Sequence, residues 1–213
     1  MEFDRKEALR YLGYRGQEPD TATMELLESC GRELSAASDR RHLMREFPLS
    51  VDGNGRIDGV CFQTDSKSLS RNLGGCGQVL VMAATLGPGV DRLLARYGKI
   101  QMAKAVVMQA VSAAMIEAYC NELCAGWRRE YEEKGLYLRP RFSPGYGDFP
   151  LECQQGILDD LEAGKRIGIT LTDSLLMMPS KSVTAVIGVS TTKGFCLVEG
   201  CEACAKTDCA FRR

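Results

Sequence analysis

The segment Leu138–Pro150, LRPRFSPGYGDFP, constrains the fold more than any other part of the sequence. It contains three prolines and two glycines. Each proline removes a backbone N–H and fixes φ, and the glycines allow backbone conformations that other residues resist. The segment is therefore predicted to be a rigid, shaped loop. Within it, Arg141 offers donors for a carboxylate and Tyr146 offers a flat ring, although an ordinary Pro-rich connection with one surface arginine has the same composition.

The residues before this loop, Ile100–Lys134, form the clearest predicted helix, because apolar residues recur every three or four positions. Glu117 interrupts the small and apolar face of this helix. A carboxylate there needs a partner, and either a cationic ligand or Arg141 would serve; a surface lysine is the alternative. Cys120 and Cys124 share one helical face without a third ligand nearby, so we interpret them as small core residues.

Periodicity and turn residues predict the other elements. Helices are predicted at Glu2–Tyr14, from Thr21, and at Lys67–Asn72, Val90–Tyr97 and Gln154–Ala163; strands are predicted at Phe47–Val51, Ile57–Gln63, Gln78–Leu86, Ile167–Leu171 and Ser182–Ser190. The strand at 78–86 is almost continuously apolar, which is typical of burial on both faces. The glycine turn after it lacks the G-K-S/T of a phosphate loop and the spacing of the Rossmann glycines, so neither nucleotide-binding fold is expected.

The charge balance and the single histidine exclude several classes of function. The formal net charge is −1, from 27 basic and 28 acidic residues, which gives no reason to expect a nucleic-acid or membrane partner. No apolar run approaches a membrane span of about 20 residues, and the charged N-terminus is unlike a signal peptide, so we expect a cytoplasmic protein. His42 is interpreted as a partly exposed surface residue. Because it is the only histidine in the sequence, a His-rich zinc site and a pair of catalytic imidazoles are excluded.

Four of the ten cysteines lie near the end of the chain in a C-x4-C-x2-C-x4-C pattern: Cys196, Cys201, Cys204 and Cys209. In a cytoplasmic chain such residues are reduced thiols or metal ligands rather than a disulfide framework. Thiolates on short loops can close around zinc or an iron–sulfur cluster. Reduced structural thiols and a redox disulfide are the alternatives for this tail.

Three ordered blocks of the sequence resemble the activation domain of vitamin B12-dependent methionine synthase. The run R-F-S-P-G-Y at Arg141–Tyr146 resembles the R-x-x-P-G-Y signature of that family. The segment Leu171–Val183, LTDSLLMMPSKSV, is similar to the family's L-T-E-S-x-x-M-x-P-x-x-S-V. The helical piece Glu117–Tyr119 matches the family's E-A-F/Y at the expected distance before the arginine. After Tyr146 the family's histidine and cysteine are replaced here, while the prolines and glycine that shape the loop are kept.

The resemblance implies an α+β fold, with a twisted antiparallel sheet flanked by helices. We expect one activation-type domain at 1–213, with an N-terminal helical part at 1–46, an α+β core at 47–190 and the Cys-rich tail at 196–213. It also implies a site for S-adenosylmethionine, in which the matching Glu contacts the ligand. A carboxylate can meet the ligand's ammonium group and an arginine its carboxylate. The expected binding residues are Glu117, Arg141, Ser143, Pro144, Gly145 and Tyr146.

These observations lead to a hypothesis of a stand-alone reactivation subunit. It would bind S-adenosylmethionine and support reductive methylation of cob(II)alamin on a cobalamin-binding methionine synthase that lacks its own activation domain. The partner would supply the cobalamin and its histidine ligand, and an electron donor such as flavodoxin or ferredoxin would supply the electron. One alternative is a corrinoid-protein binding or electron-transfer module that uses the cysteine tail. Another is a structural partner protein that keeps the fold but binds no ligand.

Overall fold

The structure, a computed structural model, describes residues 3–14, 16–52, 57–58 and 62–193. The helices are α1 (Arg5–Tyr11), α2 (Thr21–Ala37), α3 (Lys67–Asn72), α4 (Pro88–Ile100), α5 (Met102–Glu132), α6 (Cys153–Asp160) and α7 (Ala163–Arg166). The strands are β1 (Arg41–Pro48), β2 (Ser50–Val51), β3 (Ile57–Asp58), β4 (Gln78–Thr85), β5 (Tyr137–Leu138), β6 (Thr170–Leu171), β7 (Met177–Met178) and β8 (Ser182–Ser190). The predicted long helix, the helix at 67–72 and the strands at 78–86 and 182–190 are confirmed.

The central element is a four-stranded sheet in the order β1-β4-β8-β5, and all of its neighbouring strands pair antiparallel. In β4 every residue after the first is buried, as the apolar run predicts. Its neighbour β8 is almost as deeply buried, and the two strands pair along their whole length, from Gln78 opposite Val189 to Thr85 opposite Ser182. The sheet is therefore covered on both faces.

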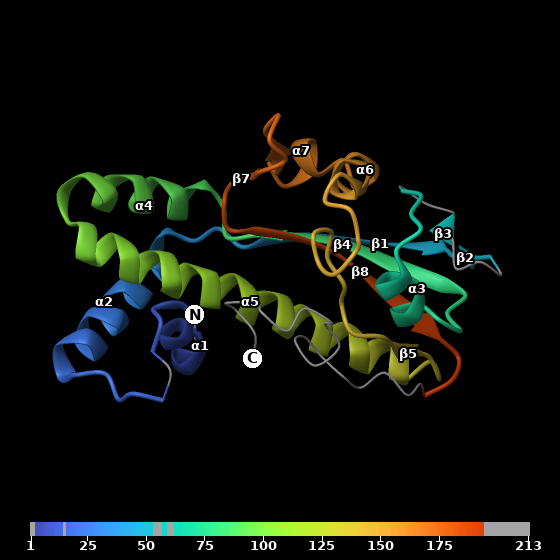
Figure 1. The fold of residues 1–213 in the computed structure, drawn as a ribbon, viewed down its shortest axis with the longest axis horizontal. Helices are drawn as coiled ribbons and strands as arrows, with labels where there is room; N and C mark the ends of the chain where they lie inside the picture. Colours follow the sequence, from blue (N-terminus) through green and yellow to red (C-terminus); the bar gives the residue numbers. More distant parts are fainter. Residues whose placement is uncertain (1–2, 15, 53–56, 59–61, 194–213) are drawn as a thin grey trace.

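Each face of the sheet has its own hydrophobic cluster, because successive side chains of a strand point to opposite sides. Leu80, Met82 and Ala84 of β4 pack with residues of α1, α2, α4 and α5. Val79, Val81 and Ala83 pack with residues of α3, α6 and α7. In Figure 1, α5 runs along one side of the sheet with α1 and α2 beyond it, and α6 and α7 lie on the other side. The polypeptide must therefore pass from one layer to the other between α5 and α6.

The first strand of the sheet starts earlier than predicted. β1 begins at Arg41, whereas the sequence predicted a strand from Phe47, so the boundary expected at residue 46 falls inside β1. The physical reason is that β1 is an edge strand with most of its residues exposed, and its charged residues conceal the alternation that marks a strand. His42 lies in β1 opposite Ala84. It is exposed, as expected, and its Nδ1 lies 2.9 Å from the hydroxyl oxygen of Tyr119 on α5.

Two smaller ladders complete the described part of the chain. β2 pairs with β3, which confirms a strand pair in the region where one was predicted. The strand predicted at Ile167–Leu171 is shortened to β6, which pairs with β7. Ile167 and Ile169 are buried in the cluster of α6 and α7 instead, since apolar residues can be buried by packing without a ladder.

Candidate functional site

The segment from Arg139 to Pro150 carries the chain from the α5 layer to the α6 layer along the outer edge of β8 (Figure 1). After β5 ends, the backbone N–H of Arg139 donates to the carbonyl of Gly188 at 2.8 Å. Phe142 and Val186 then exchange two backbone hydrogen bonds, each of 2.8 Å. The first half of the loop is therefore fixed as an irregular edge strand, with Arg141 between two anchored positions.

The side chain of Arg141 contacts two acceptors on one face of α5. Its Nη2 lies 2.6 Å from Oε2 of Glu117 and donates to Oδ1 of Asn121 at 2.9 Å. Glu117 and Asn121 are four residues apart, which places them on the same helical face. The Arg141 and Glu117 side chains are only 20 % and 25 % exposed. Among the partners considered for Glu117, the structure therefore shows Arg141. The neutral amide of Asn121 contacts the same nitrogen, Nη2 of Arg141.

The positive charge of Arg141 is favoured by its surroundings. Burial acts to lower the pKa of Arg141, but the charge of the Glu117 carboxylate and its hydrogen bond outweigh it, so this pKa is raised above its ordinary value. Burial also raises the pKa of the Cys120 thiol to about 12, against the opposing effect of Arg141. The thiol is therefore neutral at physiological pH. Cys120 is fully buried and Cys124 packs against the same core, as the sequence predicted.

The far end of the loop is fixed by Asp148 at the start of α3. Its carboxylate accepts hydrogen bonds from Oγ of Ser66 at 2.6 Å and from the backbone N–H groups of Lys67 at 2.8 Å and Ser68 at 3.1 Å. Burial opposes the charged form, but these hydrogen bonds hold the pKa of Asp148 at about 2. Next to it, Phe149 is 1 % exposed within the cluster of α6 and α7.

Between these anchors lies the tight turn that contains the remaining predicted binding residues. The N–H of Tyr146 donates to the carbonyl of Ser143 at 3.1 Å, and Gly145 has φ +88°, a conformation that favours glycine. Pro144 is buried, whereas the Tyr146 side chain is 59 % exposed. The structure therefore brings Arg141 and Glu117 into contact and places Ser143, Pro144, Gly145 and Tyr146 in the turn that follows.

Two residues of this region were not among the sequence predictions. Asn121 follows Glu117 at a spacing of four, so a helical-face argument could have found it. Asp148 has no such local signal, because its three donors lie about 80 residues earlier in the chain. Only the tertiary fold brings the loop to the first turn of α3.

The predicted thiolate ligands Cys196, Cys201, Cys204 and Cys209 lie outside the residues that the structure describes. Among residues 3–193, apart from the gaps given above, no group of three or more His, Cys, Asp or Glu side chains is arranged to hold a metal ion. In the same part of the chain, no helix combines the length and the hydrophobicity that crossing a membrane requires.

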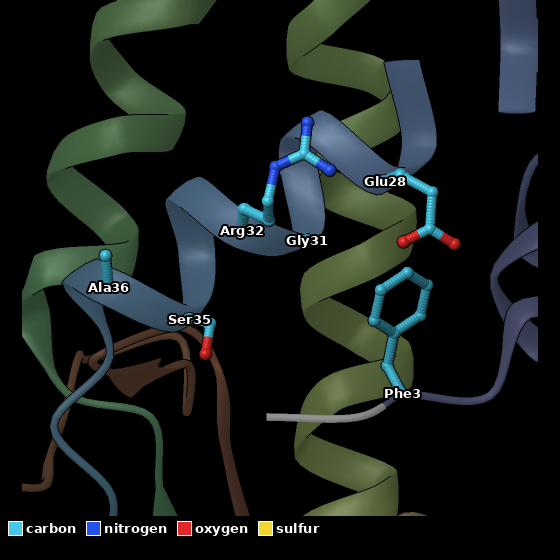
Figure 2. Close-up of a pocket in the computed structure, with 6 residues that line it drawn as sticks. All are labelled: Phe3, Glu28, Gly31, Arg32, Ser35 and Ala36. Carbon is cyan, nitrogen blue, oxygen red and sulfur yellow. The ribbon is translucent and has the colours of Figure 1, made fainter. Parts of the chain in front are cut away.

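A pocket beside α2 offers no comparable chemistry (Figure 2). Figure 2 shows the Phe3 ring lying against α2, below Glu28 and beside Gly31. A Cβ at Gly31 would come within 2.5 Å of the Phe3 ring, so the glycine makes room for that ring. Glu28 is already ion-paired with Arg5 of α1. We therefore interpret this hollow as the place where the N-terminal segment packs on α2.

Comparison with known proteins identifies the family and the fold. A family model described as vitamin B12 dependent methionine synthase, activation domain, matches residues 71–210. The chain also resembles the crystal structure of the MetH reactivation domain bound to AdoHcy, with a TM-score of 0.69 and 19 % sequence identity, over 91 % of this chain and 75 % of that chain. No curated protein matches the chain. The structural likeness confirms the predicted α+β fold with an antiparallel sheet and flanking helices.

Proposed function

Because the chain belongs to the family of activation domains of vitamin B12-dependent methionine synthase, we propose that it binds S-adenosylmethionine at Arg141 and Glu117. The proposed task is to reactivate a cobalamin-dependent methionine synthase as a separate subunit. The observation that carries this proposal is the 2.6 Å contact between Arg141 and Glu117, at the rigid loop that contains R-F-S-P-G-Y. Both residues lie inside the matched region, and the structural neighbour is a reactivation domain bound to AdoHcy.

The residues at this position fit the functional groups of S-adenosylmethionine. The guanidinium of Arg141 has five donors, and its contacts with Glu117 and Asn121 use Nη2 alone. It therefore suits the α-carboxylate of the ligand, while the Glu117 carboxylate suits the α-ammonium group. The turn from Ser143 to Tyr146 adds backbone groups and an exposed aromatic ring beside the pair. When bound, S-adenosylmethionine supplies a methyl group.

The contribution of this chain to the reaction is to bind and orient the methyl donor. The proposed site contains a charged pair, an amide and a neutral thiol, and the reaction asks for no general acid or base from it. A rigid loop anchored at both ends suits that task, because positioning two reactants removes much of the entropic cost of their meeting. The cobalamin is held by the partner in this proposal.

Exposed apolar residues in and just after the loop, and others that follow α6 and α7 in the chain, support a partner of this kind. Tyr146 and Leu151 are 59 % and 39 % exposed, and a Cβ at Gly145 would lie 3.3 Å from Leu151. Leu176 and Met178, which follow α6 and α7 in the chain, are 63 % and 48 % exposed. Apolar side chains that gather in one area of a surface are typical of an interface with another molecule, and Leu151 lies beside the turn that carries Tyr146. We propose that they face the cobalamin-binding subunit, with flavodoxin or ferredoxin as the electron donor.

Anaerobic calorimetry of S-adenosylmethionine binding tests the proposal. Wild-type protein should bind the ligand saturably, and Arg141→Ala should weaken binding by about 100-fold or more, because a charged ligand group loses its partner in a partly buried site. Circular dichroism should show that the variant is folded. Absence of binding by the wild type, both alone and with a cobalamin-loaded methionine synthase, would refute the proposed function.

The cysteine tail supports a second candidate function. The family match extends through residue 210 and so includes Cys196, Cys201, Cys204 and Cys209. We propose that these thiols bind zinc or an iron–sulfur cluster, which in the second case would make the chain an electron-transfer module for a corrinoid protein. Metal analysis together with an absorbance that bleaches on reduction would identify a cluster, and a colourless zinc-loaded protein would exclude electron transfer by the tail.

A further inference from the structure

The hairpin formed by β6 and β7 contains a strained residue at its turn. Leu175 has φ +60°, the left-handed conformation that a leucine adopts rarely. Hydrogen bonds with Thr172 close the turn. The N–H of Leu175 donates to the Thr172 carbonyl at 2.9 Å, and the N–H of Leu176 donates to the Thr172 hydroxyl at 3.1 Å. Because a strained backbone persists only where its surroundings hold it, the contacts around Leu175 are informative.

Gln154, in the first turn of α6, holds this strained turn from outside the hairpin. It is 2 % exposed, and its side-chain amide nitrogen donates to the carbonyl oxygen of Leu175. A buried donor of this kind is costly to leave unpaired. The contact joins residues that are 21 positions apart in the chain, so it fixes the hairpin against α6.

The conformation of the turn decides which side chains of β7 face outward. β6 and β7 pair antiparallel in one register. In this register Met177 packs against the cluster of α6 and α7, whereas Leu176 and Met178 are 63 % and 48 % exposed. Because side chains alternate along a strand, a shift of one residue would exchange the buried and exposed faces. The left-handed turn at Leu175 therefore keeps two large apolar side chains at the surface.

Gln154 also connects the hairpin to the loop that precedes α6. Its backbone N–H donates to the carbonyl of Leu151 at 3.1 Å, and Leu151 lies beside the turn that carries Tyr146. Leu151 and Tyr146 are the exposed apolar residues at the loop end of the proposed partner surface. One buried residue therefore contacts both segments that carry exposed apolar side chains.

We infer that Gln154 is a positioning residue for the partner surface, because it acts through Leu175 to hold the hairpin in the register that presents its apolar side chains. This inference rests on the proposed function, in which those side chains face the cobalamin-binding subunit, and it names the residue that prepares them for binding. A surface that is held in its bound conformation before the partner arrives loses less conformational entropy on binding. Loss of the Gln154 donor should therefore weaken partner binding without changing the S-adenosylmethionine site.

Hydrogen exchange measured on the full chain tests the positioning directly. Gln154→Met keeps an unbranched side chain of similar length and removes the amide donor. The amides of Leu175 and Leu176 should then exchange at least about tenfold faster, while the amides of β4 and β8 keep their wild-type rates. Gln155→Met is the matched control, because it makes the same change on α6 at an exposed amide that donates to Asp159 at 2.9 Å. It should leave exchange in the hairpin unchanged.

Partner binding is measured with a cobalamin-loaded methionine synthase that lacks an activation domain, in the presence of S-adenosylmethionine. Gln154→Met should raise the Kd for this partner about tenfold, while the affinity for S-adenosylmethionine alone and the circular dichroism spectrum match those of wild type. A second substitution separates positioning from a packing defect. Asparagine adopts the left-handed conformation more readily than leucine, so Leu175→Asn added to Gln154→Met should restore most of the lost affinity and protection. A packing defect would not be repaired by that change.

The outcomes separate this inference from the proposed function. If wild type binds S-adenosylmethionine and the partner, but Gln154→Met changes neither hairpin exchange nor partner affinity, the positioning role is wrong and the proposed function stands. If exchange in the hairpin rises and partner affinity does not fall, the hairpin lies outside the interface, and the inference is again wrong. If wild type binds neither S-adenosylmethionine nor the partner, both the inference and the proposed function are overturned.

Discussion

Two charged side chains, one near each end, fix the loop between β5 and α6, and they bind different kinds of partner. At one end, Arg141 contacts the side chains of Glu117 and Asn121 on α5. At the other end, Asp148 accepts from two backbone N–H groups and one hydroxyl at the start of α3. Backbone donors are fixed by the helix that carries them, whereas a side-chain partner can rotate to a new contact.

This difference separates the structural end of the loop from the end that is proposed to bind S-adenosylmethionine. The Asp148 end continues directly into Phe149, which is buried. Contacts at this end therefore contribute to the stability of the folded protein. At the other end, Arg141 contacts the carboxylate of Glu117, which is the same functional group as the carboxylate of the proposed ligand. Substitutions at the two ends should therefore divide into those that change stability and those that change affinity.

The largest stability effect is expected at Phe149. Its ring lies 5.2 Å from the ring of Phe62 and 6.3 Å from that of Phe142, centroid to centroid, and is fully buried. Phe149→Ala should lower the free energy of unfolding by about 3–5 kcal/mol, because it leaves a cavity in the cluster of α6 and α7. Urea unfolding followed by circular dichroism measures this. Tyr146→Ala is the control, since an exposed side chain should cost less than about 0.5 kcal/mol.

The next effect in size is expected for Asp148→Ala. Removing this carboxylate leaves the first N–H groups of α3 without their side-chain acceptor, and such a loss costs about 1–2 kcal/mol. The free energy of unfolding should fall by this amount, while the affinity of the folded protein for S-adenosylmethionine should fall far less than in Arg141→Ala. If Asp148→Ala weakened binding as strongly as Arg141→Ala, the proposed division between the two ends would be wrong.

The pH dependence of stability should identify the same contact. The pKa of Asp148 is held at about 2, below the ordinary value of an aspartate, so the folded state favours the charged form. Its contribution is therefore present above the unfolded-state pKa of about 4 and is lost as the pH falls from there towards about 2. Asp148→Asn should be less stable than wild type at pH 6, and that difference should shrink over this window. Unfolding curves at pH 6, 4 and 2.5 measure it, and a difference that stays constant would contradict the assignment.

The two ends also differ in how far the sequence predicts them. Glu117 and Arg141 were identified because they lie in short blocks with recognisable spacing, and the helix period at α5 would also have led to Asn121. Asp148 was missed because its partners are set by the packing of α3 against the sheet, which no local pattern encodes.

The same distinction holds for the strands. β8 was predicted with its observed limits because it is buried and rich in branched residues, whereas β1 begins at Arg41 among charged side chains. A buried strand must be apolar throughout, and an exposed edge strand carries no such requirement. Position in the sheet therefore decides how clearly a strand can be read from its own residues.

The smallest effect concerns the backbone of the loop at Gly147. This residue has φ +55°, and a Cβ there would lie 3.1 Å from Oγ and 3.3 Å from Cβ of Ser68, next to the Asp148 contact. Gly147→Ala should therefore lower the free energy of unfolding by about 1 kcal/mol, the usual cost of a left-handed conformation for a residue with a side chain.

Gly126 provides the matched control because it lies inside α5 with open space around its Cβ position. Gly126→Ala should raise the free energy of unfolding by about 0.5–1 kcal/mol through higher helix propensity. Urea unfolding measures both changes in the free energy of unfolding. If Gly147→Ala lowers it and Gly126→Ala raises it, the Asp148 end of the loop requires a particular backbone conformation. If Gly147→Ala were neutral or stabilising, that end would adapt as freely as a surface turn, and the rigidity ascribed to it would be wrong.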